Sequence, residues 1–149
     1  MKKIALLVSG SMGLDLLRSF KKQKLKSDII IIDKKSSNLY ISTIKRLKVS
    51  KKIYFAGKKF SKKLILYIKN NISIILSFEW PFILSDNYIK LCKFGIINNH
   101  SSYLPYERGV HSYVYSILEN HPKGVTLHFM DKKVDAGKIF KQKKIKVKD

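Results

Sequence analysis

The sequence is short of cysteine, of acidic residues and of long apolar runs. Cys92 is its single cysteine among 149 residues, so an intramolecular disulfide and a cysteine-based metal cluster are both excluded. No stretch approaches the roughly 18 apolar residues that a membrane-spanning helix needs. The apolar run after Met1 is interrupted by Ser9 and Gly10, so it predicts a β-strand and not a secretory signal. We therefore expect a cytoplasmic protein without a membrane segment or a metal.

Acidic residues number only ten against 31 Lys and Arg, which gives a formal net charge of +21. Arginine is scarce, with three positions, and the lysines are scattered in pairs along the chain. Two explanations account for this excess of lysine, and the composition does not decide between them. One is the codon bias of an AT-rich genome. The other is a functional basic surface for RNA, a nucleotide diphosphate or a polyglutamylated folate tail.

The chain does contain enough apolar and aromatic residues to fold, with 45% hydrophobic residues, eight Phe and eight Tyr. Short apolar runs typical of buried strands alternate with helical patterns. We expect an α/β fold: a Rossmann-like, mostly parallel sheet flanked by helices, with a C-terminal strand pair. The expected strands are 4–8, 29–32, 52–55, 73–78, 125–130 and 139–147, and the expected helices start near Leu14 and cover 37–48 and 59–71.

Three polar residues in the last third indicate chemistry. Asn98 and His100 follow an apolar run two positions apart, so they share one face at the carboxyl end of a strand, where α/β sheets bind ligands. Asp135 lies 35 positions beyond His100 in a turn that could return to that strand. An amide, an imidazole and a carboxylate together suit acyl transfer. Taken singly, an Asx turn, a structural histidine and a turn residue remain alternatives.

Around these residues the chain resembles the folate-dependent formyltransferase family. Within the family, the residues of the matching motifs are most similar to those of the sugar N-formyltransferases. The resemblance is densest from Gly95 to Gln142 and covers nearly the whole chain. It implies that Asn98, His100 and Asp135 are the catalytic triad. Ser101 stands where the family commonly has proline. The matching motifs are Asn98-Asn99-His100, Leu104-Pro105, Arg108-Gly109, Gly124-x-Thr126-x-His128 and Asp135-x-Gly137.

The resemblance also implies a co-substrate, N10-formyltetrahydrofolate, and no metal. Its pterin ring would lie against the apolar loop after the fourth expected strand, and for Trp80 and Phe82 core packing is the alternative role. The residues expected to bind this co-substrate are Trp80, Phe82, Ile83, Leu84 and Asp131.

On the acceptor side, the resemblance implies that the turn at Ser9 and Gly10 approaches a substrate phosphate, although a simple tight turn is the alternative. Arg108, Gly109 and His111 are further expected substrate contacts; stabilising the loop is the alternative for Arg108, and a surface position without a role is the alternative for His111. We expect structural roles for His121 and His128. The leading acceptor is an amino sugar on a nucleotide diphosphate. Glycinamide ribonucleotide and methionyl-tRNA are the alternatives within the family.

We expect residues 1–149 to form a single catalytic domain that lacks the C-terminal part of the usual formyltransferase domain. A homodimer is possible by the resemblance, whereas nucleic acid and membranes are not the expected partners. A hypothesis from another class is a non-catalytic basic binding module on the same scaffold.

Overall fold

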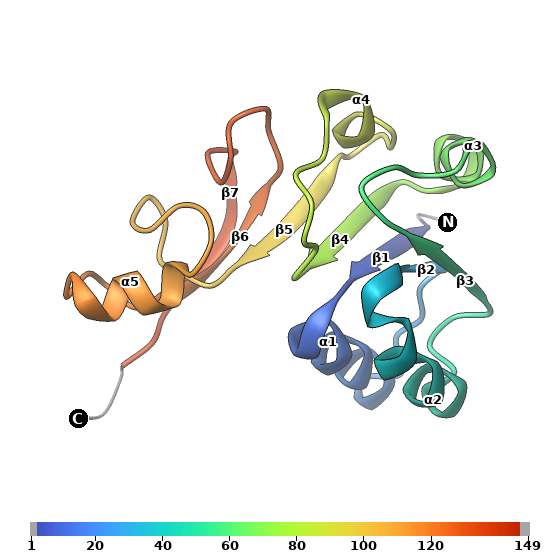
Figure 1. The fold of residues 1–149 in the computed structure, drawn as a ribbon, viewed down its shortest axis with the longest axis horizontal. Helices are drawn as coiled ribbons and strands as arrows, with labels where there is room; N and C mark the ends of the chain where they lie inside the picture. Colours follow the sequence, from blue (N-terminus) through green and yellow to red (C-terminus); the bar gives the residue numbers. More distant parts are fainter. Residues whose placement is uncertain (1–2, 147–149) are drawn as a thin grey trace. The chain divides into compact units, whose positions relative to one another are not determined.

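A computed structural model describes residues 3–146, and it divides into two compact units, one up to Ile96 and one from Ile97 onward. The first unit holds a parallel sheet with the strand order β3-β2-β1-β4 (Figure 1). In its register Leu6 lies opposite both Ile30 and Leu76. The strands are β1 (Ile4–Val8), β2 (Ile29–Asp33), β3 (Lys52–Ala56) and β4 (Ile74–Phe78).

Helices connect these strands and cover both faces of the sheet. In Figure 1, α1 and α2 lie on one side of the four strands and α3 on the other. The predicted alternation of strands and helices is confirmed, and each predicted strand of this unit agrees with the structure to within one residue. The helices are α1 (Gly10–Lys22), the short 3-10 turn η1 (Lys34–Ser36), α2 (Ser37–Leu47), α3 (Lys62–Asn71) and α4 (Asp86–Ile89).

The core of this unit forms where β1 and β2 meet the apolar sides of α1 and α2. All five residues of β2 are buried, as expected for a strand covered on both faces. Each fully buried Leu or Ile side chain stabilises the fold by roughly 1.5–3 kcal/mol. The buried cluster contains Leu6, Val8, Leu14, Leu17, Phe20, Ile30, Ile32, Tyr40, Ile44 and Val49.

Close packing of α1 depends on Gly13. A Cβ atom at this position would lie 2.1 Å from the Tyr40 hydroxyl and 2.9 Å from the Val8 Cβ. The Tyr40 hydroxyl donates to the Gly10 carbonyl at 2.9 Å, which ties α2 to the start of α1. Burial, and after it the nearby Glu79 carboxylate, raises the pKa of Tyr40 far above its usual value. Tyr40 is therefore a neutral hydrogen-bond donor.

The second unit is antiparallel. β5 (Ile96–His100) pairs with β6 (Gly124–Phe129), and β6 pairs with β7 (Ile139–Lys144). The predicted strand pair near the C-terminus is thereby confirmed, with β6 starting one residue earlier than expected. The predicted end of the last strand at residue 147 lies outside the described residues.

The helix α5 (Ser112–Leu118) of this unit turns its polar side inward. Ser112 and Ser116, four positions apart, are its buried residues, whereas Leu118 is 70% exposed. The side chains it exposes are apolar or aromatic: Tyr113, Val114, Tyr115, Ile117 and Leu118. Apolar surface of this kind marks a contact site or an association hazard.

No helix within residues 3–146 is both long and apolar enough to cross a membrane.

Candidate active site

The pairing of β5 with β6 gathers four polar side chains on one face. Asn98 lies directly opposite His128, and His100 lies opposite Thr126. Residues two apart on a strand share a face, so all four side chains project to the same side. His100 is 6% exposed and His128 1%, whereas Asn98 is half-buried. The predicted proximity of Asn98 and His100 is present in the structure.

Asp135 comes to this face from the loop between β6 and β7. Its Oδ2 lies 3.4 Å from the His100 Nδ1, and its Oδ1 lies 3.3 Å from the His128 Nε2. The carboxylate also accepts a hydrogen bond from the Gly109 backbone amide at 2.8 Å. Gly137 allows this loop to return, because a Cβ there would lie 1.8 Å from the Phe129 carbonyl oxygen. One carboxylate is therefore held between two imidazoles.

Asp135 and His128 each stabilise the charged form of the other. Burial works against ionisation of Asp135, but His128, the Gly109 amide and His100 outweigh it and lower the pKa of the carboxyl. Burial likewise opposes protonation of His128, but the Asp135 carboxylate and the Phe129 carbonyl outweigh it and raise the pKa of the imidazole. The cluster thus favours a negative Asp135 and a positive His128. The 3.3 Å contact is an ion pair rather than a well-aligned hydrogen bond.

His100 has its proton positions set by two acceptors. Its Nε2 lies 2.7 Å from the Glu107 carbonyl oxygen and donates to it. A neutral imidazole then carries no proton on Nδ1, the atom that faces Asp135. When His100 takes up a second proton, that proton lies on the Asp135 side and the carboxylate stabilises the cation. The geometry therefore suits a histidine that gains and loses a proton.

The loop that provides the Glu107 carbonyl is braced by buried hydrogen bonds. The Ser102 hydroxyl donates to the Tyr106 carbonyl at 2.7 Å. Thr126, fully buried on β6, donates to the Ser102 carbonyl at 2.7 Å and accepts from the Leu104 amide at 3.1 Å. Gln142 of β7 donates to the Leu104 carbonyl at 2.7 Å. This network holds in place the oxygen that orients His100.

The Asn98 amide makes no side-chain hydrogen bond with the residues that the structure describes, so it is available to a ligand. His128, for which we expected a structural role, lies beside Asp135 in this cluster, which the sequence did not indicate. The spacing of Thr126 and His128 signalled a shared face, but only the strand register shows which face. Within residues 3–146, no group of His, Cys, Asp and Glu is arranged to hold a metal ion.

The other residues expected near the acceptor differ in their placement. Gly109 reaches the cluster through its backbone amide. Arg108 and His111 are exposed, and His111 has left-handed backbone at the start of α5, with φ +56°. Among the described residues, neither side chain forms a hydrogen bond or an ion pair with Asn98, His100 or Asp135. Their role in binding substrate stays a prediction.

The turn at Ser9 and Gly10 is shorter than expected, because the helix after it starts before Leu14. The helix α1 already begins at Gly10, and the Glu79 carboxylate accepts a hydrogen bond from the Met12 amide at 2.7 Å. The Ser9 hydroxyl lies 3.0 Å from that of Ser36. A carboxylate of the chain itself thus occupies the helix end where a substrate phosphate was expected.

The apolar loop after β4 contains both packed and exposed side chains. Trp80 makes edge-to-face contacts with Phe60 and Phe82, at ring-centroid distances of 6.2 and 5.9 Å. Leu84 is buried, whereas Ile83 is 76% exposed. The Trp80 Nε1 is buried without a hydrogen-bond partner among the described residues. Trp80 and Phe82 therefore pack against other aromatic rings, in line with the alternative of core packing. The Trp80 Nε1–H nevertheless remains without an acceptor.

Asp131 is the one residue expected to bind the co-substrate that belongs to the second unit. Its side chain is exposed, and its Oδ1 accepts a hydrogen bond from the Lys132 backbone amide at 2.6 Å. This contact is local, between neighbouring residues. A role in binding the co-substrate stays a prediction.

Comparison with known proteins gives a consistent result. The formyl transferase family model matches residues 2–149. The bifunctional polymyxin resistance protein ArnA of Wigglesworthia glossinidia brevipalpis is 37% identical over 145 residues, which are 94% of this chain and 22% of ArnA. The chain therefore spans about a fifth of the length of this relative.

Solved structures show the same fold. The formyltransferase PseJ from Anoxybacillus kamchatkensis, in complex with UDP-4,6-dideoxy-4-formamido-L-AltNAc and tetrahydrofolate, is 27% identical with a TM-score of 0.61, over 98% of this chain and 61% of PseJ. Phosphoribosylglycinamide formyltransferase from Bacillus halodurans is 22% identical with a TM-score of 0.77, over 99% of this chain and 81% of that one. These similarities confirm the predicted fold class.

Proposed function

This chain belongs to the formyl transferase family, and from that membership we propose that it transfers a formyl group from N10-formyltetrahydrofolate to a primary amine. The observation that carries the proposal is the Asp135 carboxylate held between His100 and His128, on the face that also presents the unpaired Asn98 amide. An amide donor beside a histidine–carboxylate pair suits a reaction in which negative charge develops on an acyl oxygen.

Each member of the triad has a distinct role in this proposal. The Asn98 amide donates to the formyl oxygen as negative charge develops on it. His100 exchanges the proton that must leave the attacking amine. Asp135 stabilises the His100 cation and fixes the ring orientation through the contact at 3.4 Å. His128 is a positioning residue, because it acts on the reaction only through Asp135.

The residues of the loop after β4 fit the pterin ring of a folate co-substrate. The loop after β4 offers apolar side chains and the unpartnered Trp80 Nε1 donor. A donor among apolar groups suits a ring that carries hydrogen-bond acceptors, such as a pterin. When bound, N10-formyltetrahydrofolate would supply the formyl group, and Trp80, Phe82 and Ile83 would contact its ring.

We propose a nucleotide-linked amino sugar as the acceptor. The residues of the matching motifs support it, because they are most similar to those of sugar N-formyltransferases. The 27% identity to PseJ, whose structure contains a UDP-linked formamido sugar, supports it as well. A cytoplasmic location and a homodimer stay predictions.

The proposal is tested by incubating the purified chain with N10-formyltetrahydrofolate and UDP- or GDP-linked 4-amino sugars, and detecting the formamide product by mass spectrometry. We expect Asn98→Ala to lower kcat about 10²- to 10³-fold and His100→Ala roughly 10²- to 10⁴-fold. Asn99→Ala is the matched control, because its side chain leaves the opposite face of β5, and it should retain activity.

Two results would contradict the proposal in different ways. A folded chain that binds a non-reactive formyl-folate analogue but formylates no amino sugar would overturn the acceptor. A folded chain that does not bind the analogue would overturn the enzymatic proposal and favour the basic binding module, whose affinity for a partner should depend on lysines and not on Asn98.

A further inference from the structure

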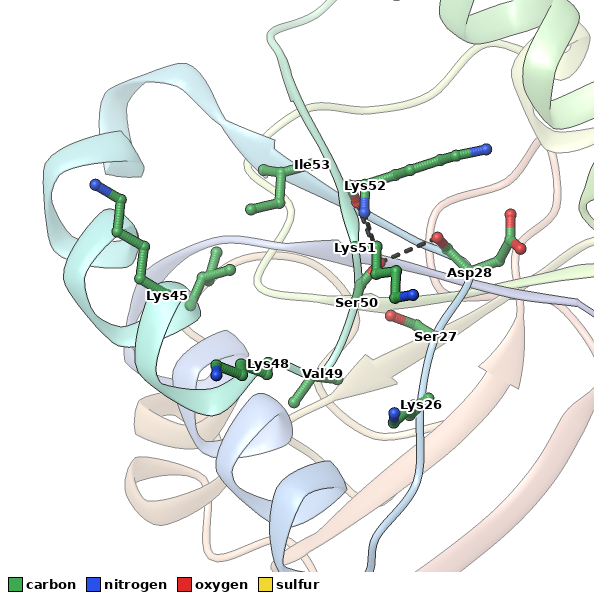
Figure 2. Close-up of a pocket in the computed structure, with 11 residues that line it drawn as sticks. Lys26, Ser27, Asp28, Lys45, Lys48, Val49, Ser50, Lys51, Lys52 and Ile53 are labelled. Carbon is green, nitrogen blue, oxygen red and sulfur yellow. Dashed lines mark hydrogen bonds between the residues drawn. The ribbon is translucent and has the colours of Figure 1, made fainter.

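The first unit has a hollow of about 560 Å³ at the edge of its sheet where β2 and β3 begin. Segments that precede these two strands form it, together with the end of α2 (Figure 2). Ligands of α/β sheets usually bind at the opposite edge, where the strands end. In this unit Ser9 and Glu79 lie at that opposite edge, directly after β1 and β4. The hollow is therefore a site separate from them.

The floor of the hollow is apolar and its rim is cationic. Ile44 and Val49 are buried beneath it, and Lys26, Lys48 and Lys51 are exposed around it. None of these three ammonium groups, nor that of Lys45 on α2, forms an ion pair with the residues that the structure describes. A volume of this size is in the range of small-ligand sites, about 300–1,000 Å³.

The acidic residue in the lining does not neutralise these lysines. Asp28 accepts a hydrogen bond from the Tyr67 hydroxyl at 2.6 Å, and Tyr67 in turn accepts one from Lys52 at 2.8 Å. Lys3 lies 3.9 Å from the same carboxylate. In Figure 2 the Lys52 side chain leads away from the other lysines. Asp28 thus interacts with Lys3 directly and with Lys52 through Tyr67, so it does not neutralise Lys26, Lys45, Lys48 or Lys51.

A buried hydroxyl in the wall is an independent observation. Ser27 is 8% exposed, and its Oγ has no hydrogen-bond partner among the described residues. Its backbone amide donates to the Val49 carbonyl at 3.1 Å, which fixes its position between the two strand starts. Figure 2 shows the hydroxyl on the side of its backbone that faces Lys48 and Val49. Buried polar groups are almost always paired, so this donor indicates a missing partner.

The lysines are more concentrated here than in the chain as a whole. Five of the eleven residues that line the hollow are lysines: Lys26, Lys45, Lys48, Lys51 and Lys52. Lysines in the last turn of a helix stabilise its dipole, which accounts for Lys45. Lys48 is the C-cap of α2, so the same reason applies to it, whereas Lys26 and Lys51 lie beyond the helices and have no such explanation. Lys48 even adopts left-handed backbone, with φ +51°, where glycine would be favoured.

We propose that this hollow binds a small ligand that carries a diphosphate or triphosphate group. The phosphate oxygens contact Lys26, Lys48 and Lys51 and accept the Ser27 hydroxyl, and the carbon part of the ligand lies over Ile44 and Val49. RNA fits less well, because the lining contains neither arginine for planar recognition nor an aromatic ring on which a base could stack.

The probe for this proposal is inorganic triphosphate, titrated calorimetrically into the whole chain at low ionic strength. We expect one saturable site. The Lys48→Ala/Lys51→Ala double variant should weaken it by at least tenfold. The matched control is Lys58→Ala/Lys59→Ala, an exposed pair in the loop after β3, which removes the same charge and should bind like the wild type. Ser27→Ala should weaken binding several-fold without a change in Tm.

Three outcomes would overturn the proposal: no saturable binding, equal weakening by both double variants, or tighter binding of a single-stranded RNA oligomer that depends equally on both lysine pairs. The proposal does not depend on formyl transfer, so Asn98→Ala should leave triphosphate binding unchanged. Failure of the enzymatic proposal and failure of this one are therefore distinguishable.

Discussion

Asp135 and His128 form a buried ion pair, with 3.3 Å between the carboxylate Oδ1 and the imidazole Nε2. The other carboxylate oxygen faces His100 at 3.4 Å, so His128 secures the group that would stabilise the His100 cation. The strand register that places His128 opposite Asn98 makes this arrangement possible.

His128→Gln should therefore change how activity depends on pH. Without the imidazolium, the pKa of Asp135 rises, and the acidic limb of the kcat/KM profile should move to higher pH. At neutral pH the loss should be smaller than that of His100→Ala. His121→Gln is the control, because His121 pairs with the Glu107 carboxylate instead. An unchanged acidic limb would contradict the positioning role.

The same pair predicts a pH window of stability. Asp135 has a lowered pKa, so its contribution is present above 3.8 and is lost as the pH falls through the folded-state value. His128 has a raised pKa, so its contribution is present below 6.5 and is lost as the pH rises through the folded-state value. Between these limits, Asp135→Asn should cost about 1.5–3 kcal/mol, the value of charged hydrogen bonds. Urea unfolding across pH measures this, and a constant difference would contradict it.

Gly13→Ala should destabilise the first unit although alanine favours helices. The new methyl group would meet the Tyr40 hydroxyl at 2.1 Å, and overpacking of this kind costs roughly 1–3 kcal/mol. Ser11→Ala, at an exposed position of the same helix, is the control. Removing the hydroxyl with Tyr40→Phe should recover part of the loss in the double variant. Additive unfolding free energies would show that the two residues do not clash.

Glu79→Ala should open the start of α1. The Met12 amide loses its partner at 2.7 Å, and the loss of a hydrogen bond to a charged group costs about 1.5–3 kcal/mol. Hydrogen exchange at the Met12 amide should become faster, whereas Glu119→Ala, an exposed change of equal charge, should leave it unaltered. Equal exchange in the wild type and in Glu79→Ala would mean that the carboxylate does not protect this amide.

Trp80, the single tryptophan, offers a direct test of the folate prediction. If its indole donates to a bound pterin, a non-reactive formyl-folate analogue should change the intrinsic fluorescence saturably. Trp80→Phe, which keeps the aromatic packing with Phe60 and Phe82, should weaken binding of the analogue in calorimetry. Binding of equal strength in the variant would remove Trp80 from the predicted site.

Local pattern was sufficient to predict the strands of the first unit, because runs such as Ile29 to Ile32 are buried on both faces. The start of α1 was not predictable from local pattern. It depends on Glu79, 67 positions beyond Met12, and no neighbouring residue signals that contact. The helix α5 was missed for another reason: it buries two serines and exposes its apolar residues, the reverse of the usual amphipathic pattern.

For the candidate site, spacing predicted that Asn98 and His100 share a face and that Asp135 lies in a turn. It could not assign His128, because its neighbour across the strands is set by the register of β5 and β6. The role of the Glu107 carbonyl was not predictable either, because every residue has a backbone carbonyl and the sequence does not indicate which one lies near His100.

The outward apolar side of α5 has a consequence for how the protein behaves in solution. Mutual repulsion between molecules of net charge +21 keeps these surfaces apart, and that repulsion weakens as salt shortens its range to about 10 Å at 0.1 M. The attraction between the exposed apolar and aromatic side chains of α5, which are Tyr113, Val114, Tyr115, Ile117 and Leu118, does not weaken in the same way. Added salt should therefore drive self-association, and sulfate, which strengthens apolar burial, should do so at lower concentration than chloride.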